Sequence, residues 1–546
     1  MKTVFAALNA KYIHVNLALR SIAGVCRDFS PRIHEFTIND NIDSIIASLH
    51  MEKADVIAFS CYIWNIERIL YISQSLKKVN PKLIIILGGH EVSYDAHEVI
   101  EKNPWVDFVV RGEGEEPMLR LLSALEHNSA LREVPSITYR EGGVIIQTQL
   151  ASPGNINDYP FAYDDSIKSF KGKIIYYESS RGCPFNCSYC LSGEGRRVNY
   201  LDLDRVKREL LFFIENDVPL VKFVDRTFNA DKKRAREIWK FIINNSKNTC
   251  FHFELAGNLI DDETIELLKD APKGIIQFEI GVQSTNRRTI SQIGRSIEFE
   301  KVCENVKKLL KPDNIHIHLD LIAGLPYEDY ESFKKSFDDV VGIFPHVVQL
   351  GFLKLLKGSK LRGQAEQFGY KYKDKAPYEV MENNFICFDE IIKLKAIEDI
   401  FDKYYNSGNF KRSINFLSKH IASPFEIFER IYIYFEEHNL FEQSISLESH
   451  YEILEKIFPY DGFCDYVKAD RLTNKKAKLP YENELIFKER CFEFLKNEKN
   501  VEKYLPYYKG LPPRKIYTKL RFEKLFGGVY IYETENDVLT EITGDF

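Results

Sequence analysis

Three cysteines lie close together at Cys183, Cys187 and Cys190, separated by three and two residues. They stand on a loop with glycine and proline that directly follows a predicted strand. Three thiolates can bind three irons of a 4Fe-4S cluster and leave the fourth iron open to an external ligand. Structural zinc is the alternative, but zinc prefers four ligands in paired knuckles, and no second cysteine pair lies nearby. The spacing therefore predicts an iron–sulfur centre with one open coordination position.

The remaining cysteines and the overall composition indicate a reduced, globular protein. The chain has 546 residues, 45% of them hydrophobic and 28% charged, and a net charge of −6, which argues against broad nucleic-acid binding. The apolar runs are strand-sized and the N-terminus shows no signal peptide, so we expect a cytoplasmic protein without a membrane span. Seven cysteines occur singly in apolar contexts and are expected to be buried core residues: Cys26, Cys61, Cys250, Cys303, Cys387, Cys464 and Cys491.

The cysteine loop, with Tyr189 just before its last cysteine, resembles the signature of the radical S-adenosylmethionine (SAM) superfamily. The resemblance implies that SAM chelates the open iron through its amino and carboxylate groups. Electron transfer from a donor such as flavodoxin or ferredoxin then cleaves SAM to methionine and a 5′-deoxyadenosyl radical. The cofactors supply this chemistry, while the protein orients the reactants and excludes water.

Two downstream segments resemble the SAM-contacting strands of the same superfamily. Residues 279–284 resemble the strand that meets the methionyl end, which implies roles for Gln283 and Ser284. Glu254 is a second candidate for the SAM amino group. The segment from Leu321 to Pro326 resembles the one that lies along the adenine.

The first 150 residues alternate short apolar strands with amphipathic helices, which predicts a doubly wound α/β domain. The expected strands are residues 3–8, 56–60, 83–88 and 108–111, followed by a hairpin over 136–147. Residues 88–90 and 111–116, at two strand ends, resemble the cobalamin-binding domain of a large radical SAM subgroup. The axial-ligand sequence Asp-x-His-x-x-Gly does not occur in this stretch, so the occupancy by cobalamin stays open.

A linker over residues 151–160 separates this domain from a second repeat of strands and helices. Six strands between residues 173 and 358 predict a partial parallel β/α barrel, which we assign to residues 165–375. Residues 376–546 are expected to form a mostly helical C-terminal domain, with helices over 379–405 and 423–438 and a strand near 529–532. The predicted fold class is thus α/β, with a cobalamin-binding-like domain, a radical SAM partial barrel and a helical C-terminal domain.

Polar residues gather where the predicted barrel strands end, and alternation places His252 with Glu254, and His316 with His318 and Asp320, on common faces. Buried polar groups are costly unless they are paired or bind a ligand, so a polar, hydrogen-bonding small molecule is expected. Candidate catalytic residues are Asp225, His252 and Glu254. The candidate substrate-binding residues are Asn9, Tyr12, His14, Asp225, Asn229, His252, Asn258, His318, Asp320 and Lys354.

The arrangement as a whole is similar to one branch of the cobalamin-domain radical SAM proteins that includes queuine lyases. This resemblance implies cleavage of the C–N bond of queuine to give 7-aminomethyl-7-deazaguanine. Cobalamin-dependent methyl transfer to a small molecule is the enzymatic alternative. A non-catalytic iron–sulfur or RNA-interaction protein, using the basic stretch from Lys509 to Lys524, is the alternative from a different class.

Overall fold

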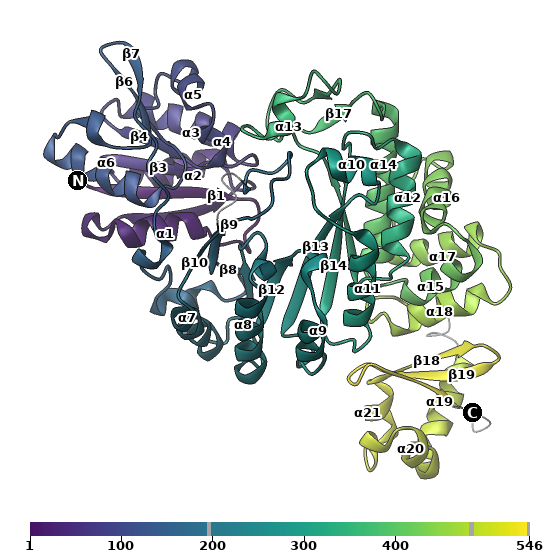
Figure 1. Cartoon of the computed structure of the whole chain (residues 1–546). Coiled ribbons are helices and arrows are strands. Elements are labelled where there is room, and N and C mark those ends of the chain that lie inside the picture. Colours follow the sequence, from purple (N-terminus) through teal and green to yellow (C-terminus); the bar gives the residue numbers. More distant parts are fainter. Residues whose placement is uncertain (194–197, 480–484, 543–545) are drawn as a thin grey trace. The chain divides into compact units, whose positions relative to one another are not determined.

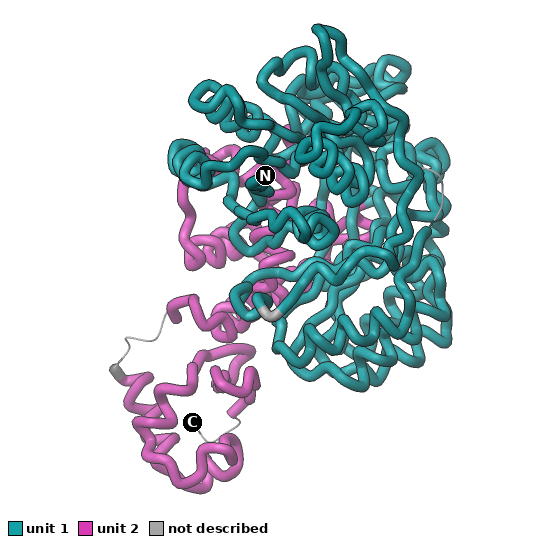
Figure 2. The backbone as a smooth tube through the Cα atoms, turned by 90° about the vertical axis from the view of Figure 1, so that its left-hand side faces the viewer, with its two compact units in different colours: residues 1–336, 343–391 teal, residues 337–342, 392–546 magenta. Residues whose placement is uncertain are grey.

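The computed structural model describes residues 1–193, 198–479, 485–542 and 546, which fall into two compact units (Figure 2). Unit 1 comprises residues 1–336 and 343–391, and unit 2 comprises residues 337–342 and 392–546. The N-terminal α/β domain and the barrel therefore belong to the same unit. No helix among the described residues combines the length and the apolar character that crossing a bilayer requires.

The N-terminal domain, purple to blue in Figure 1, is built on a seven-stranded sheet in the order β2-β1-β3-β4-β5-β6-β7. The first five strands in this order are parallel, whereas β6 and β7 form the predicted antiparallel hairpin at one edge. The edge strand β2 was not predicted, because its histidine, glutamate and arginine break the apolar pattern. The strands are β1 (Thr3–Asn9), β2 (Arg32–Thr37), β3 (Val56–Ser60), β4 (Ile84–Gly88), β5 (Phe108–Val110), β6 (Ile137–Glu141) and β7 (Val144–Gln147).

Helices cover both faces of this sheet, which explains the continuous apolar run of β1. Val4, Ala6 and Leu8 point to the core under α2, α3 and α5, whereas Phe5 and Ala7 point to the core under α1 and α6. All the side chains of β1 are buried. The helices are α1 (Leu17–Val25), α2 (Ile42–Met51), α3 (Ile66–Val79), α4 (His90–Ser93), α5 (Ala96–Lys102) and α6 (Glu115–His127).

The second part of unit 1 is an open parallel sheet in the order β15-β14-β13-β12-β11-β8, as the six predicted strands require. Outward-facing Phe253 and Phe278 pack against Trp239 of helix α8, so one side of the sheet is apolar. The strands are β8 (Ile175–Tyr177), β11 (Leu220–Phe223), β12 (Cys250–Leu255), β13 (Ile276–Gln283), β14 (His316–Ala323) and β15 (Val347–Phe352). The helices are α7 (Leu203–Glu215), α8 (Lys232–Asn245), α9 (Asp262–Lys269), α10 (Arg287–Gln292), α11 (Phe299–Leu310) and α12 (Tyr330–Val341).

The helix expected from residue 379 begins later, as α14 (Phe388–Phe401). The preceding residues form β17 (Val380–Glu382), which pairs with β16 (Lys371–Tyr372). A turn then follows, in which the Asn383 side chain accepts hydrogen bonds from the amides of Phe385 and Ile386. Strand pairing and this turn thus outweigh the local helical pattern.

Unit 2 is mostly helical, and the strand expected near residue 530 is the middle strand of a three-stranded antiparallel sheet. The sheet strands and helix α19 share an apolar core of their own. The elements are α15 (Lys411–His420), α16 (Pro424–Glu437), α17 (Leu447–Ile457), α18 (Phe463–Thr473), α19 (Leu485–Lys496), α20 (Glu498–Tyr504), α21 (Pro513–Tyr517), β18 (Leu520–Leu525), β19 (Gly528–Glu533) and β20 (Val538–Ile542).

Candidate active site

The cysteine loop leaves the sheet through β9 (Ser180–Gly182) and is anchored at its root by Asp225. The buried carboxylate of Asp225 accepts hydrogen bonds from the amide of Ser179 at 2.9 Å and from the hydroxyls of Ser179 and Ser180, both at 2.6 Å. Burial raises the pKa of Asp225 to about 6. Asp225 was a candidate catalytic and substrate-binding residue, but the structure commits its oxygens to holding this loop.

Two of the three cysteine thiols have polar neighbours from other elements. Cys183 Sγ lies 3.3 Å from the hydroxyl oxygen of Thr227, and Arg295 Nη1 lies 3.8 Å from Cys187 Sγ. Burial raises the pKa of Cys187, and the charge of Arg295 opposes this shift. Arg295 also donates to the hydroxyl oxygen of Tyr189 at 3.2 Å.

The donor set of this loop, three cysteines within eight residues, suits a 4Fe-4S cluster. In a cluster each cysteine ligates a different iron, so its thiolates need not converge on one point. Cys183, Cys187 and Cys190 would hold three irons of such a cluster.

Lys222, Glu279 and His252 form an ion cluster on the inner face of the barrel sheet. Lys222 Nζ lies 3.0 Å from Glu279 Oε2, and His252 Nε2 lies 3.3 Å from the same oxygen. Burial disfavours the charge of Glu279, but the ammonium of Lys222, together with His252 and His318, keeps the pKa of Glu279 below its ordinary value. Burial and Lys222 lower the pKa of His252 to about 3, so this ring is neutral at physiological pH.

Glu254 and Asp320 continue this polar face, which Arg226 adjoins. We call the side chains of this face the inner row of the barrel: Lys222, His252, Glu254, Glu279, His318 and Asp320. Arg226 Nη1 lies 3.8 Å from Glu254 Oε2, and Lys222 Nζ lies 4.0 Å from Glu254 Oε1. Burial, reinforced by the charges of Glu279 and Glu254, raises the pKa of Asp320 to about 8. Asp320 Oδ1 and His252 Nδ1 are buried and have no hydrogen-bond partner among the described residues. These two atoms are therefore available to a polar ligand.

Among the residues expected to contact SAM, Gln283 offers a polar atom to a ligand, whereas the others are engaged in internal contacts or buried. Gln283 ends β13 with a φ of 73°, next to a register irregularity, and its buried Oε1 lacks a partner among the described residues. This orphaned oxygen fits a bound polar ligand such as the methionyl end of SAM. Ser284, in contrast, donates to buried Glu328 at 2.6 Å. Leu321 is fully buried on the face opposite Asp320, because side chains alternate along a strand, and Pro326 is buried with its carbonyl oxygen accepting from Thr289.

The sheet edge of the N-terminal domain lies against the barrel. Tyr176 of β8 and the Nδ1 of His14, in the loop after β1, are hydrogen-bonded at 2.8 Å. Glu115, which follows the loop after β5, accepts a hydrogen bond from Arg181 Nη2 at 2.7 Å, so this edge also meets the segment that leads into the cysteine loop.

The same edge can accommodate a large cofactor. His90 is exposed, and Gly112, with a φ of 69°, has no atom within 4 Å of the place that a Cβ would take. Bare backbone of this kind allows close approach of a ligand, as the strand-end rule for α/β sheets predicts. Residues around Gly88, His90 and Gly112 would therefore hold cobalamin.

Other predicted substrate residues have different surroundings. Asn9 is buried and donates to the carbonyl of His14 at 3.0 Å, whereas Tyr12 is 71% exposed. Buried Asn229 exchanges hydrogen bonds with the backbone of Ala256. Half-buried His318 lies in the inner row, with its ring 6.0 Å from that of His252. Asn258 donates to the Ser296 carbonyl at 3.4 Å. Lys354 is exposed, and its backbone pairs with that of Glu379 in an isolated antiparallel β-bridge.

Three residues of the site did not follow from the sequence: the ion-cluster members Lys222 and Glu279, and Arg295 beside Cys187. Lys222 carried a weak signal, because it is a lone charge within an apolar strand. Glu279 lay in the SAM-like segment, but its role in the ion cluster depends on its register with Glu254 and His318. Arg295 follows a short helix and no sequence pattern marks it.

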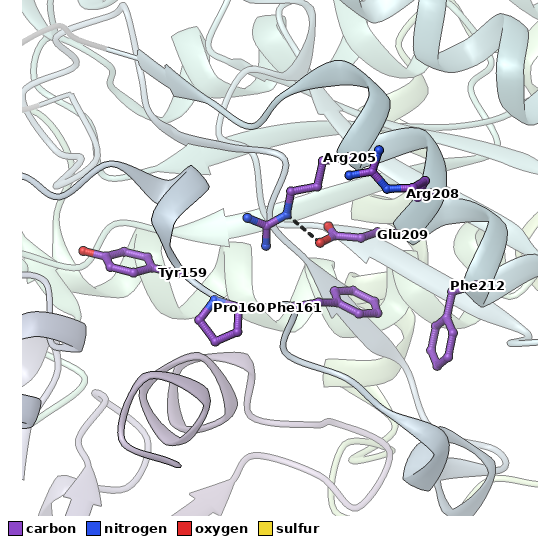
Figure 3. A pocket seen from close by; sticks show the side chains of 7 residues that line it. All are labelled: Tyr159, Pro160, Phe161, Arg205, Arg208, Glu209 and Phe212. Atoms are coloured by element: carbon purple, nitrogen blue, oxygen red, sulfur yellow. Dashed lines mark hydrogen bonds and ion pairs between the residues drawn. The ribbon is translucent and has the colours of Figure 1, made fainter. Parts of the chain in front are cut away.

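A surface hollow lies away from this inner row and is lined by aromatic rings and two arginines (Figure 3). Arg205 Nε lies 2.7 Å from Glu209 Oε1, so one of the arginines is paired. The hollow is shallow and open to solvent. Its lining residues are Tyr159, Pro160, Phe161, Arg205, Arg208, Glu209 and Phe212.

Three family descriptions match successive parts of the chain. Residues 3–122 match the B12 binding domain, and residues 177–340 match the Radical SAM superfamily. Residues 366–542 match a protein of unknown function (DUF4080). The first two matches confirm the predicted α/β domain and the radical SAM barrel, and with it the 4Fe-4S cluster and SAM.

Curated relatives include two methyltransferases. The 2-(S-pantetheinyl)-carbapenam-3-carboxylate methyltransferase of Streptantibioticus cattleyicolor is 26% identical over 383 residues, 62% of this chain and 53% of that protein. The cobalamin-dependent radical SAM methyltransferase TokK of Streptomyces tokunonensis is 24% identical over 400 residues, 67% of this chain and 57% of that protein. The chain thus spans little more than half the length of these relatives.

A solved structure shares the fold. The cobalamin-dependent SAM radical enzyme OxsB, with aqua-cobalamin and SAM bound, matches with a TM-score of 0.60 and 16% identity. The match covers 86% of this chain and 78% of that one. This likeness shows that the two chains share a fold.

Proposed function

We propose that this chain, a radical SAM protein with a B12-binding domain, uses SAM and cobalamin to transfer a methyl group to a small polar molecule. One observation carries the proposal: the sheet edge where cobalamin would lie is hydrogen-bonded to the barrel, since His14 Nδ1, in the loop after β1, lies 2.8 Å from the Tyr176 hydroxyl of barrel strand β8. A substrate bound to the inner row would therefore lie between the two cofactor sites. Methyl transfer needs such a shared space.

The chain's own residues would bind and orient the reactants. When bound, the cluster with SAM supplies a 5′-deoxyadenosyl radical, and cobalamin supplies a methyl carrier. Gln283 would bind the methionyl end of SAM through its orphaned oxygen. Protonated Asp320 would donate a hydrogen bond to the substrate, while ionised Glu279 and neutral His252 would accept or exchange protons. An electron donor such as flavodoxin or ferredoxin would reduce the cluster.

Similarity to methyltransferases supports methyl transfer over the lyase activity that the sequence resemblance implied. The two curated relatives described above are methyltransferases, and neither is a lyase. The C–N cleavage of queuine remains a second candidate because of one feature of the inner row. Asp320 as donor, with Glu254 and Glu279 as acceptors, offers both kinds of partner that the edge of a purine-like base requires.

A spectroscopic and product assay separates these candidates. The full chain is reconstituted anaerobically with iron, sulfide and hydroxocobalamin, freed of unbound corrinoid, then reduced in the presence of SAM. Methyl transfer predicts a retained corrinoid spectrum and stoichiometric S-adenosylhomocysteine without added substrate. Lyase activity predicts 7-aminomethyl-7-deazaguanine when queuine is added. A chain that retains no corrinoid and forms no S-adenosylhomocysteine refutes the methyltransferase proposal.

A further inference from the structure

Arg181, on β9 two residues before Cys183, is held by carboxylates from two parts of unit 1. Its Nε and Nη2 lie 3.0 and 2.7 Å from the two oxygens of Glu178, which belongs to the same segment. Its Nη2 and Nη1 lie 2.7 and 3.3 Å from the two oxygens of Glu115, at the start of α6 in the N-terminal domain. Glu113 of that domain adds a contact at 3.4 Å. The guanidinium therefore joins the two parts of the unit with two forked contacts.

Glu115 is well placed to transmit the position of the sheet edge. It is 4% exposed and also accepts a hydrogen bond from the Ser21 hydroxyl of α1 at 2.9 Å. The loop before it, residues 111–114, forms part of the sheet edge assigned above to cobalamin. Gly114 has so little space that a Cβ there would lie 2.8 Å from Ile22 Cδ1. The loop and the helix start are thus packed against α1.

We propose that Glu115 and Arg181 are positioning residues that couple the ligand-binding edge of the N-terminal domain to the cysteine loop. A ligand that shifts residues 111–114 moves Glu115, and the forked contact passes this movement to Arg181 and so to Cys183. Closely packed elements transmit small shifts because their interiors leave little room for adjustment. The coupling to cobalamin rests on the proposed function, whereas the positioning of the cluster loop does not.

The test compares the electron paramagnetic resonance (EPR) spectrum of the reduced cluster in the wild type and three variants. Glu115→Gln removes the charge of the pair, and Arg181→Lys keeps the charge but loses the fork. Glu116→Gln is the matched control, because Glu116 is the neighbouring residue of α6 and pairs with Arg120 on the exposed surface. Iron content and thermal unfolding by circular dichroism are measured for each variant, so that spectra are compared only between folded, loaded proteins.

We expect Glu115→Gln and Arg181→Lys to alter the line shape of the reduced cluster, with SAM bound and without it, while Glu116→Gln keeps the wild-type spectrum. Wild-type line shapes in both Glu115→Gln and Arg181→Lys would overturn the positioning role. If either variant fails to fold, the other decides the question, and Glu115→Asp, which shortens the reach to Arg181, replaces the lost one.

Adding hydroxocobalamin tests the coupling itself. The wild-type and Glu116→Gln spectra are expected to change on addition, whereas the Glu115→Gln spectrum stays constant although the visible spectrum shows the corrinoid bound. A bound corrinoid that leaves the wild-type cluster spectrum unchanged would overturn the coupling. A wild type that binds no corrinoid would instead refute the proposed function. The positioning role would not be affected, because it is decided by the line shapes measured without corrinoid.

Discussion

Asp320 lies beside two other carboxylates, Glu254 and Glu279. When Asp320 is protonated, it is neutral and does not repel these two groups. Its pKa rises from 3.8 to about 8, so the folded chain binds a proton that the unfolded chain releases. This stabilising contribution is complete below about pH 4 and is lost as the pH rises through about 8. We expect Asp320→Asn, which keeps the neutral shape, to remove part of the pH dependence of stability. Urea unfolding of the variant and the wild type at several pH values between about 4 and 8 gives the free energy of unfolding as a function of pH. If this free energy changes with pH equally in both proteins, the assigned protonation of Asp320 is wrong.

Cys187 and Cys491 are both buried, yet only one of them stands in the cysteine loop. Cys187→Ala removes one of three iron ligands, so we expect loss of most bound iron and of the visible absorbance after anaerobic reconstitution. Cys491→Ala removes a thiol from an apolar core of unit 2. It should retain its iron and lose only about 1 kcal/mol of stability. Equal iron in the two variants would rule out the cluster ligand set.

At the scale of elements, Asp225 links β11 to the root of the cysteine loop. Asp225→Ala leaves the Ser179 amide and two hydroxyls without their buried acceptor, at about 1–3 kcal/mol for each group left unsatisfied. We expect a clear drop in the unfolding midpoint and a slower, less complete uptake of iron. Asp231→Ala, which removes only the exposed N-cap of α8, is the control and should lose about 1 kcal/mol with normal iron uptake.

The role of Asp225 also shows where sequence patterns lose their predictive power. Regularly spaced apolar residues predicted the six barrel strands, because one face of each strand is buried under helices. The cysteine spacing predicted the cluster because its three ligands lie within eight residues of sequence. Whether a strand-end carboxylate meets a substrate or the backbone of its own chain depends on its neighbours across the sheet. Asp225 and Ser284 are engaged by internal partners, and Lys222 and Glu279 are brought together by register alone.

At the scale of the whole molecule, the N-terminal domain and the barrel behave as one compact unit through a few specific contacts. His14 with Tyr176 and Glu115 with Arg181 are two of them. Glu91 of α4 provides the third, because Tyr378 donates to its carboxylate and Lys357 Nζ lies 3.4 Å away. Residues 357–378, which follow the last barrel strand β15, thus contact the ligand-binding edge of the N-terminal domain.

This third contact predicts how unit 1 unfolds. Glu91 is 3% exposed, so Glu91→Ala leaves the Tyr378 hydroxyl without its acceptor, which costs about 1–3 kcal/mol, while Lys357 keeps its contact with Asp95 at 3.6 Å. Calorimetry of the full chain should show a lower and broader transition, as the N-terminal domain loses part of its attachment. Glu67→Ala is the control, because Glu67 pairs with Lys375 of the same segment across 3.5 Å but in the open, where such pairs contribute about 0–1 kcal/mol. If both variants melt like wild type, contacts other than Glu91 hold the domain to the barrel, and the corrinoid affinity of Glu91→Ala should then also equal that of wild type.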